Sequence, residues 1–234
     1  MKFNAIMFDL DGTLLPMELE EFTRGYFGLL IMELAPYGYT KDDIIPAMWQ
    51  GVAAMVKNDG SVYNSERFWD VFAQILGDGI REHMLTLDKF YTTEFNKAAA
   101  FCSPTPLASV AVSLAAEKAD KLVLATNPVF PAPAVHSRLK WSGVSPDSFA
   151  LITDYDNSKF CKPNPSYYRE ICEKLSLDPS KCLMIGNNTE EDISAAKAAG
   201  FSTFLLTDCL ISKGDIPDTP KGTFQDLIKY LEKI

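Results

Sequence analysis

Phe8-Asp9-Leu10-Asp11-Gly12-Thr13-Leu14 ends an apolar run that begins at Phe3. Such a run predicts a buried strand, so two carboxylates stand one residue apart at its C-terminal end. Ligands in open α/β sheets bind beyond the carboxyl ends of the strands. Gly12 and Thr13 allow a sharp turn there, in which we expect free backbone N–H groups that bind phosphate. The stretch therefore predicts a site for a phosphate and a metal ion.

Two carboxylates at this spacing suit a phosphoryl transfer in two steps. Both side chains can reach one phosphorus atom, one as the nucleophile and the other as proton donor and acceptor. A cation is also required, because an anionic nucleophile repels an anionic phosphate, and oxygen ligands favour Mg²⁺. The alternative is an Asx-turn that only ends the strand. It accounts for Asp11 and Gly12 but leaves Asp9 unexplained.

The motif resembles the nucleophile loop of the haloacid dehalogenase-like (HAD) superfamily, whose phosphatases carry Asp-x-Asp-Gly-Thr-Leu/Val near the N-terminus. The resemblance implies that Asp9 attacks phosphorus and becomes an aspartyl-phosphate. Asp11 then protonates the leaving oxygen and afterwards activates water. Gly12 and Thr13 correspond to phosphate-binding positions, and Mg²⁺ is held by Asp9 and by the main-chain carbonyl of Asp11.

The rest of the chain divides into two regions of different pattern. Residues 16–100 show helical patterns and no convincing strand, at 18–34, 40–56, 65–76 and 80–97, with Thr40 and Ser65 as expected N-caps. From residue 104 helices and strands alternate, which predicts parallel strands joined by crossover helices. The expected helices are 107–118, 134–141, 165–175, 190–199 and 223–231, and the expected strands are 121–125, 149–153, 182–185 and 202–206.

This layout is what the HAD resemblance implies for a capped member. We expect an α/β fold, a doubly wound (Rossmann-like) parallel sheet, as a core domain of residues 1–15 and 101–234. Residues 16–100 would form an inserted α-helical cap domain. In related capped enzymes the insert closes over the active site and selects the substrate. The earliest polar and aromatic residues of the insert are therefore the candidates for leaving-group contacts, namely Glu18, Glu21, Phe22 and Arg24.

Two later segments resemble the second and third motifs of the family. Thr126-Asn127 follows an expected core strand, where a hydroxyl and a backbone N–H bind phosphoryl oxygens. Taken alone, this segment is an ordinary turn after a strand. Lys162-Pro163-Asn164-Pro165 resembles the Lys-Pro-x-Pro form of the third motif, in which the lysine supplies a fixed positive charge. Lys159 is a rival, which we interpret as a solvated surface lysine.

The fourth motif departs from the family pattern. Family members usually show Gly-Asp-x-x-x-x-Asp, whereas this chain has Asn187 at the first acidic position and keeps Asp192 at the second. An amide oxygen can ligate Mg²⁺, but more weakly than a carboxylate. The expected metal set is thus Asp9, Asp11, Asn187 and Asp192. We interpret Glu190 and Glu191 as an acidic first helical turn favoured by the helix dipole.

Composition limits the classes of partner. The chain has 234 residues, 47% of them hydrophobic, and a net charge of −9, which argues against nucleic acid and anionic membranes. Five scattered cysteines, an odd number, favour reduced thiols. The first residues form a strand and resemble no apolar leader, and no apolar run reaches the length of a membrane span. We therefore predict a soluble cytoplasmic protein.

The resemblance and the residues together predict a Mg²⁺-dependent phosphohydrolase that acts on a small phosphorylated metabolite through an aspartyl-phosphate. Phosphomutases share Asp9 and Asp11, so mutase activity stays open. Dehalogenation by Asp9 is a second alternative, although dehalogenases do not need the second acid. The amide at Asn187 motivates a third alternative, a non-catalytic binding or regulatory protein on the same fold.

Overall fold

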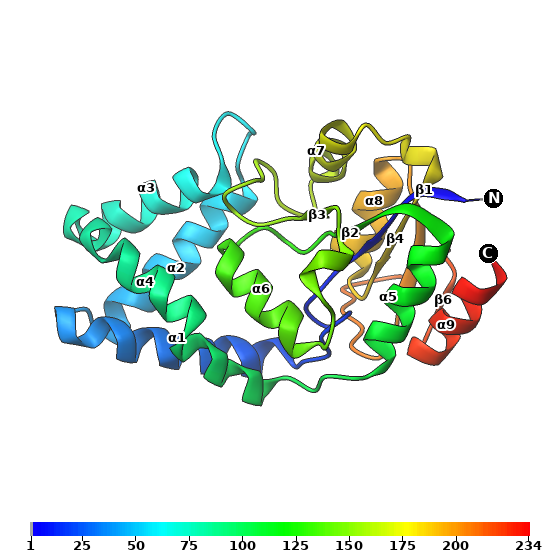
Figure 1. The fold of residues 1–234 in the computed structure, drawn as a ribbon. Coiled ribbons are helices and arrows are strands. Elements are labelled where there is room, and N and C mark those ends of the chain that lie inside the picture. Colours follow the sequence, from blue (N-terminus) through cyan, green and yellow to red (C-terminus); the bar gives the residue numbers. More distant parts are fainter. Residues whose placement is uncertain (1) are drawn as a thin grey trace.

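The computed structural model describes residues 2–234 and contains, within them, a parallel sheet of six strands (Figure 1). The spatial order is β3-β2-β1-β4-β5-β6. Because β1 pairs with β2 on one side and β4 on the other, the chain leaves the centre in both directions, which makes this the switch point of a doubly wound sheet. The strands are β1 (Phe3–Phe8), β2 (Ala119–Leu124), β3 (Leu151–Ile152), β4 (Cys182–Gly186), β5 (Ser202–Leu206) and β6 (Lys221–Gly222).

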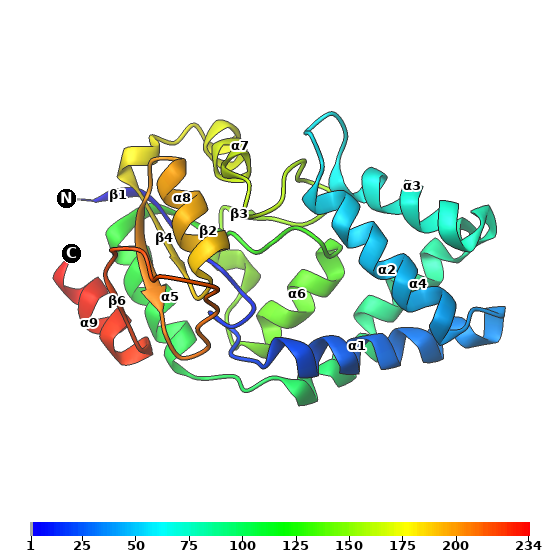
Figure 2. The same cartoon turned by 180° about the vertical axis from the view of Figure 1, so that it is seen from behind.

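Helices cover both faces of the sheet (Figures 1 and 2). Ala5 and Met7 of β1 belong to one buried cluster, together with α7 (Pro165–Leu175) and α8 (Ala195–Ala198). Ile6 and Phe8 belong to the other, with α5 (Leu107–Lys118) and α9 (Phe224–Lys233). Burial on both faces explains why the buried part of β1, residues 5–8, is apolar throughout and does not alternate with polar residues. The predicted fold class is confirmed.

A helical segment is inserted between β1 and β2 and projects to one side of the sheet (Figure 1). It consists of α1 (Leu19–Leu34), η1 (Ala35–Tyr37), α2 (Lys41–Val56), α3 (Asn64–Leu76), η2 (Asp78–His83), α4 (Met84–Thr92) and η3 (Glu94–Phe101). In both views α6 (Ala132–Trp141) lies between this segment and the sheet. Hydrogen bonds from Ser137 to the Tyr91 carbonyl and from Trp141 to Asn96 join α6 to the insert. Within residues 2–234, no helix has both the length and the apolarity to cross a bilayer.

Several predicted boundaries are wrong for local reasons. The expected helix 80–97 is divided into η2, α4 and η3. At the end of α4, the hydroxyls of Thr92 and Thr93 both donate to the Lys89 carbonyl, which favours a break before η3. Ser65 is not an N-cap, since α3 already begins at Asn64. The segment expected as helix 190–199 is a π-helix, η6 (Thr189–Ser194), followed by α8. Strand β6 and the short turns η4 (Pro146–Ser148) and η5 (Pro179–Lys181) were not predicted.

Candidate active site

The carboxyl ends of the three central strands converge on one cavity of about 460 Å³. Backbone hydrogen bonds keep these ends in register: the Asp9 N–H donates to Ile185 O (2.9 Å) and the Ala125 N–H to Phe8 O (2.7 Å). The residue that follows each strand therefore faces a shared space, as expected at a switch point. Predicted site residues that line the cavity are Asp9, Asp11, Gly12, Glu18, Thr126, Asn127, Asn187 and Asp192.

A buried lysine connects two carboxylates that line this cavity. The Lys162 ammonium lies 2.9 Å from Asp9 Oδ1 and 2.6 Å from Asp192 Oδ1. Burial alone would lower the pKa of Lys162, but the Asp192 and Asp9 carboxylates outweigh it, so this pKa stands well above its usual value. The Asn127 side chain accepts a hydrogen bond from the Lys162 N–H (3.2 Å) and helps to fix the backbone. Lys159 points elsewhere, with its ammonium 5.3 Å from the centre of the Tyr63 ring.

A second buried cation, Arg138 on α6, was not predicted. Its guanidinium forms an ion pair with Asp11 Oδ2 and lies 4.1 Å from the centre of the Phe130 ring. No motif marks Arg138 in the sequence. One feature of the sequence could have indicated a role for Arg138. It stands on the same helix face as Ala134 and Leu139, which are buried, and an arginine is rarely buried unless it has a charged partner.

The pair of Asp11 and Arg138 is incompletely satisfied. Asp11 Oδ1 and Arg138 Nη2 are buried and have no hydrogen-bond partner in the part of the chain that the structure describes. Burial raises the pKa of Asp11, opposed in part by the positive charge of Arg138. Buried polar atoms without partners are uncommon and call for a bound group or water. Arg138 thus fixes one oxygen of Asp11 and leaves the other for a ligand.

The loop that carries Gly12 and Thr13 is closed on itself. The Gly12 N–H donates to Leu15 O (2.9 Å) and the Thr13 N–H to Leu10 O (3.1 Å). The expectation of free N–H groups at these two residues is therefore wrong, because the tight turn already uses both donors. Gly12 has φ of 81°, and an added Cβ would lie 2.3 Å from Asn187 Nδ2, so both backbone and space require glycine.

Asn187 joins this loop to a neighbouring segment. Its Oδ1 accepts a hydrogen bond from the Thr13 hydroxyl (3.1 Å), and its Nδ2 donates to the Cys209 carbonyl (2.6 Å). The Cys209 carbonyl oxygen thus receives a hydrogen bond from the amide of Asn187. A carboxylate at position 187 has no N–H to donate and would place an oxygen against that carbonyl. Asp192 is also fully engaged, because Oδ1 accepts from Lys162 and Oδ2 from the Asn188 N–H (2.9 Å).

Glu191 was interpreted only as part of an acidic helical turn, and this is incomplete. Its side chain lines the cavity and accepts a hydrogen bond from Asn127 Nδ2 (3.1 Å). Burial raises the pKa of Glu191. The wider turn of η6 changes the direction of side chains relative to an α-helix, and π-turns of this kind occur often at functional sites. Glu190 is exposed, as the interpretation requires.

The candidate leaving-group residues fall in different places. Glu18 lines the site cavity, whereas Phe22 and Arg24 line a neighbouring cavity. Glu21 is in neither lining and faces Arg24 across 3.8 Å. The insert thus contributes to the site mainly through the start of α1.

The donors around the cavity fit a sparsely ligated Mg²⁺. In residues 2–234 no cluster of three or more His, Cys, Asp or Glu side chains is placed to hold a metal ion. The available donors are the Asp9 carboxylate, the Asp11 carbonyl and Asn187 Oδ1, which has a second lone pair beyond its bond from Thr13. Mg²⁺ commonly takes one or two carboxylates, with waters and substrate phosphate completing its shell. An oxygen-only set of this size fits that pattern.

The lining of the cavity is strongly acidic. Seven of its residues are Asp or Glu, and among the described lining residues none is Lys or Arg. The two cations nearby, Lys162 and Arg138, are already paired with carboxylates. An anionic ligand entering this cavity would therefore need a further positive charge.

A doubly wound sheet with a carboxylate pair and a buried lysine at its switch point is an arrangement typical of α/β enzymes. The chain belongs to the haloacid dehalogenase-like hydrolases, whose family model matches residues 3–200. This finding confirms the resemblance and the assignment as an enzyme of the hydrolase class.

Curated relatives resemble the chain over almost its full length. The phosphoglycolate phosphatase of Aquifex aeolicus (strain VF5) is 27% identical, with 97% of this chain and 96% of that protein covered. The phosphoglycolate phosphatase of Neisseria gonorrhoeae (strain ATCC 700825 / FA 1090) is 28% identical, with 97% and 93% covered.

Solved structures resemble the fold. A HAD phosphatase from Thermococcus onnurineus is 19% identical with a TM-score of 0.61, and 99% of this chain and 98% of that chain are covered. A 2-haloacid dehalogenase from Pseudomonas syringae pv. Tomato DC3000 is 18% identical with a TM-score of 0.65, and 99% of both chains is covered.

Proposed function

We propose that this hydrolase is a Mg²⁺-dependent phosphatase that acts on a small phosphorylated metabolite through an aspartyl-phosphate on Asp9. The observation that carries the proposal is the Lys162 ammonium 2.9 Å from Oδ1 of Asp9, which lines the same cavity as Asp11. A fixed cation at a carboxylate nucleophile is the arrangement that phosphoryl transfer needs. The names of the curated relatives support the phosphatase class.

The two acids take complementary roles in the proposed reaction. Lys162 holds Oδ1 of Asp9, and the other oxygen attacks phosphorus while the ester P–O bond breaks. Asp11, fixed by Arg138, gives its proton to the leaving oxygen. In the second step Asp11 takes a proton from water, which attacks phosphorus and releases Asp9 and inorganic phosphate.

Asp9, the carbonyl of Asp11 and Asn187 would hold Mg²⁺, with Asp192 acting through Lys162 as an indirect support. When bound, the ion supplies the positive charge that the acidic lining lacks. Thr126 and Asn127 would bind the phosphate, whereas Gly12 and Thr13 would shape the loop beneath it. Residues 16–100 would act as a cap domain on a core of residues 1–15 and 101–234. A cytoplasmic location stays a prediction.

Phosphate release from an aryl phosphate such as p-nitrophenyl phosphate tests the proposal. We expect release with added Mg²⁺ and loss of release with EDTA, restored by excess Mg²⁺. Chloride release from a 2-chloro acid and phosphate transfer between hydroxyls of a sugar phosphate are the matched assays for a dehalogenase and a mutase. Activity in either of those assays, with none on the aryl phosphate, would contradict the proposal.

Replacing Arg138 by Met is expected to lower kcat by roughly 10- to 100-fold, the size of effect typical when a group that orients a reacting side chain is removed. The reason is that Asp11 loses the partner of Oδ2. A double-mutant cycle with Asp11→Asn checks this, because Arg138→Met should lower kcat only slightly in a protein that already carries Asp11→Asn. Equal losses from Arg138→Met in both backgrounds would show that Arg138 acts on the fold and not through Asp11.

Replacing Asn187 by Asp is expected to tighten Mg²⁺ binding, because a carboxylate is the stronger ligand. Without metal the variant should be less stable, since its new oxygen faces the Cys209 carbonyl that Nδ2 now satisfies. Calorimetry of Mg²⁺ binding and melting curves with and without Mg²⁺ measure both effects. The control is Asn188→Asp, whose side chain caps η6 through the Glu190 and Glu191 N–H groups. Unchanged Mg²⁺ affinity in Asn187→Asp would place residue 187 outside the metal shell.

A further inference from the structure

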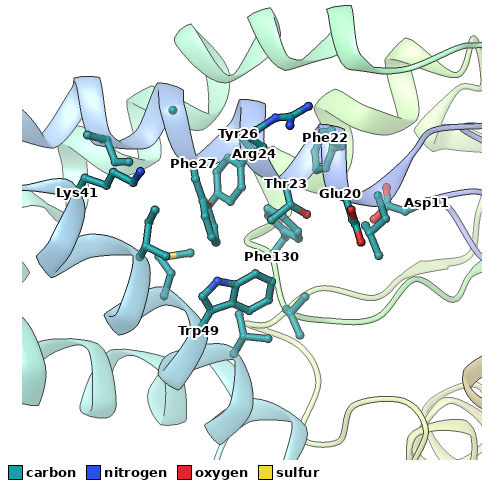
Figure 3. A pocket seen from close by; sticks show the side chains of 17 residues that line it. Asp11, Glu20, Phe22, Thr23, Arg24, Tyr26, Phe27, Lys41, Trp49 and Phe130 are labelled. Carbon is teal, nitrogen blue, oxygen red and sulfur yellow. The ribbon is translucent and has the colours of Figure 1, made fainter.

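A second cavity, of about 730 Å³, adjoins the candidate active site. It lies between α1 and α2, and Figure 3 shows aromatic and aliphatic side chains along its walls. The ring of Trp49, on α2, meets the ring of Phe27, on α1, edge to face with 5.4 Å between ring centres. We name this cavity the apolar groove, and its characteristic wall residues are Phe27, Ile31, Ile45, Met48, Trp49 and Val52.

The apolar groove is continuous with the site cavity. The two share Asp11, Leu19, Glu20, Val129 and Phe130 as lining residues. Asp11 is the proposed proton donor to the leaving oxygen, so the leaving group of a phosphate on Asp9 starts at the junction of the two cavities. From there the groove follows α1 from Leu19 to Ile31, which corresponds to about 18 Å of helix.

The charges along this path favour a neutral leaving group. A carboxylate-bearing leaving group would enter beside Glu18, Glu20 and the other acids of the site cavity, where like charges repel it. Two basic residues, Arg24 and Lys41, line the groove. Arg24 is largely exposed and faces Glu21, and Figure 3 places Lys41 at the end far from Asp11. What the groove offers along its length is apolar contact area.

We propose that the substrate is a phosphate monoester whose leaving group carries an elongated apolar body, alkyl or aryl, that lies in the apolar groove. The proposal rests on the phosphatase function proposed above, which it extends by a substrate class. Burial of apolar surface in a preformed groove supplies the binding free energy, and the acidic junction discriminates against short anionic leaving groups.

Gly28 provides a direct way to fill the groove. It lines the groove from α1, and a Cβ added there would meet no heavy atom within 4 Å. A leucine at position 28 should therefore fold normally and occupy space that a ligand would use. Gln50→Leu is the matched control, since Gln50 is exposed on α2 and lies outside the lining of the groove.

The experiment compares kcat/KM for ethyl, butyl and octyl phosphate with Mg²⁺. Each methylene that becomes buried should raise kcat/KM about fourfold. Octyl phosphate has six methylenes more than ethyl phosphate, so burial of only half of them should already raise kcat/KM by about 60-fold. Gly28→Leu should lower the octyl-to-ethyl ratio by about tenfold, whereas Gln50→Leu should retain the wild-type ratio. Binding of ethyl- and octylphosphonate, measured by calorimetry, provides a readout that does not depend on turnover.

The outcomes separate the two proposals. Two results would overturn the proposal of an apolar leaving group and leave the phosphatase function standing. One is phosphatase activity that does not depend on alkyl chain length, and the other is an unchanged octyl-to-ethyl ratio of kcat/KM in a folded Gly28→Leu protein. No activity on any phosphate would overturn the phosphatase function. In that case the phosphonates test whether the apolar groove binds an alkyl chain. Tighter binding of octylphosphonate than of ethylphosphonate would support such binding, and equal binding would refute it.

Discussion

Asp9→Asn is expected to lower phosphate release by about 10⁴- to 10⁶-fold, the range seen when the nucleophile of a covalent mechanism is removed. The substitution removes the charge that attacks phosphorus and changes almost no volume. The fold should persist, because Lys162 keeps Asp192 as a partner after losing the charge of Asp9. Steady-state assays with an aryl phosphate, together with melting curves of both proteins, measure the effect.

The Asp11→Asn variant is the control for this result. Asp11→Asn should also be severely impaired, but it retains the nucleophile and is expected to accumulate phosphate on Asp9. Mass spectrometry of the trapped protein locates that phosphate. Wild-type turnover in an Asp9→Asn protein shown to be free of deamidation would refute the mechanism, and phosphate found on another residue would refute both assigned roles.

Lys162→Met is expected to cost about 10²- to 10³-fold or more in kcat, by analogy with the loss of one preorganised hydrogen-bond donor at a transition state, roughly 2.7 to 4 kcal/mol. The Lys162 side chain is fully buried between Asp9 and Asp192, so its charge is not replaced by water. Removing it also leaves two carboxylates without their cation. A loss of stability of about 3 to 5 kcal/mol is therefore expected as well, and assays should be run well below the midpoint of unfolding.

Lys159→Met is the matched control for Lys162. Lys159 lies three residues earlier and over the Tyr63 ring, away from the carboxylates. Its replacement should change kcat by no more than about twofold, as for most partly exposed side chains. If Lys159→Met proves the more damaging of the two, the fixed positive charge of the site has been assigned to the wrong lysine.

Interactions between elements decided most of what the sequence did not predict. The ion pair of Arg138 with Asp11 joins residues 127 positions apart, and no local pattern contains it. The turn at Gly12 and Thr13 was located, but its N–H groups are used within the loop. The position of Glu191 is set in η6, a π-helix that sequence pattern does not distinguish from an α-helix, and its side chain there meets Asn127, 64 residues away in the chain. The apolar groove needs α1 and α2 side by side, which hydrophobic periodicity cannot specify.

The sequence by itself determined the fold class and the placement of the reactive acids. Apolar runs that alternate with helical patterns bury both faces of a parallel sheet, and β5 occupies residues 202–206 as predicted. Asp9 and Asp11 follow β1 directly, so their place at the edge of the sheet required no knowledge of distant contacts. The tertiary structure alone decided which charges pair, which oxygens stay free and where a leaving group fits. Those properties arise from groups far apart in the chain, whose desolvation and mutual distance exist only after the sheet and the insert have packed.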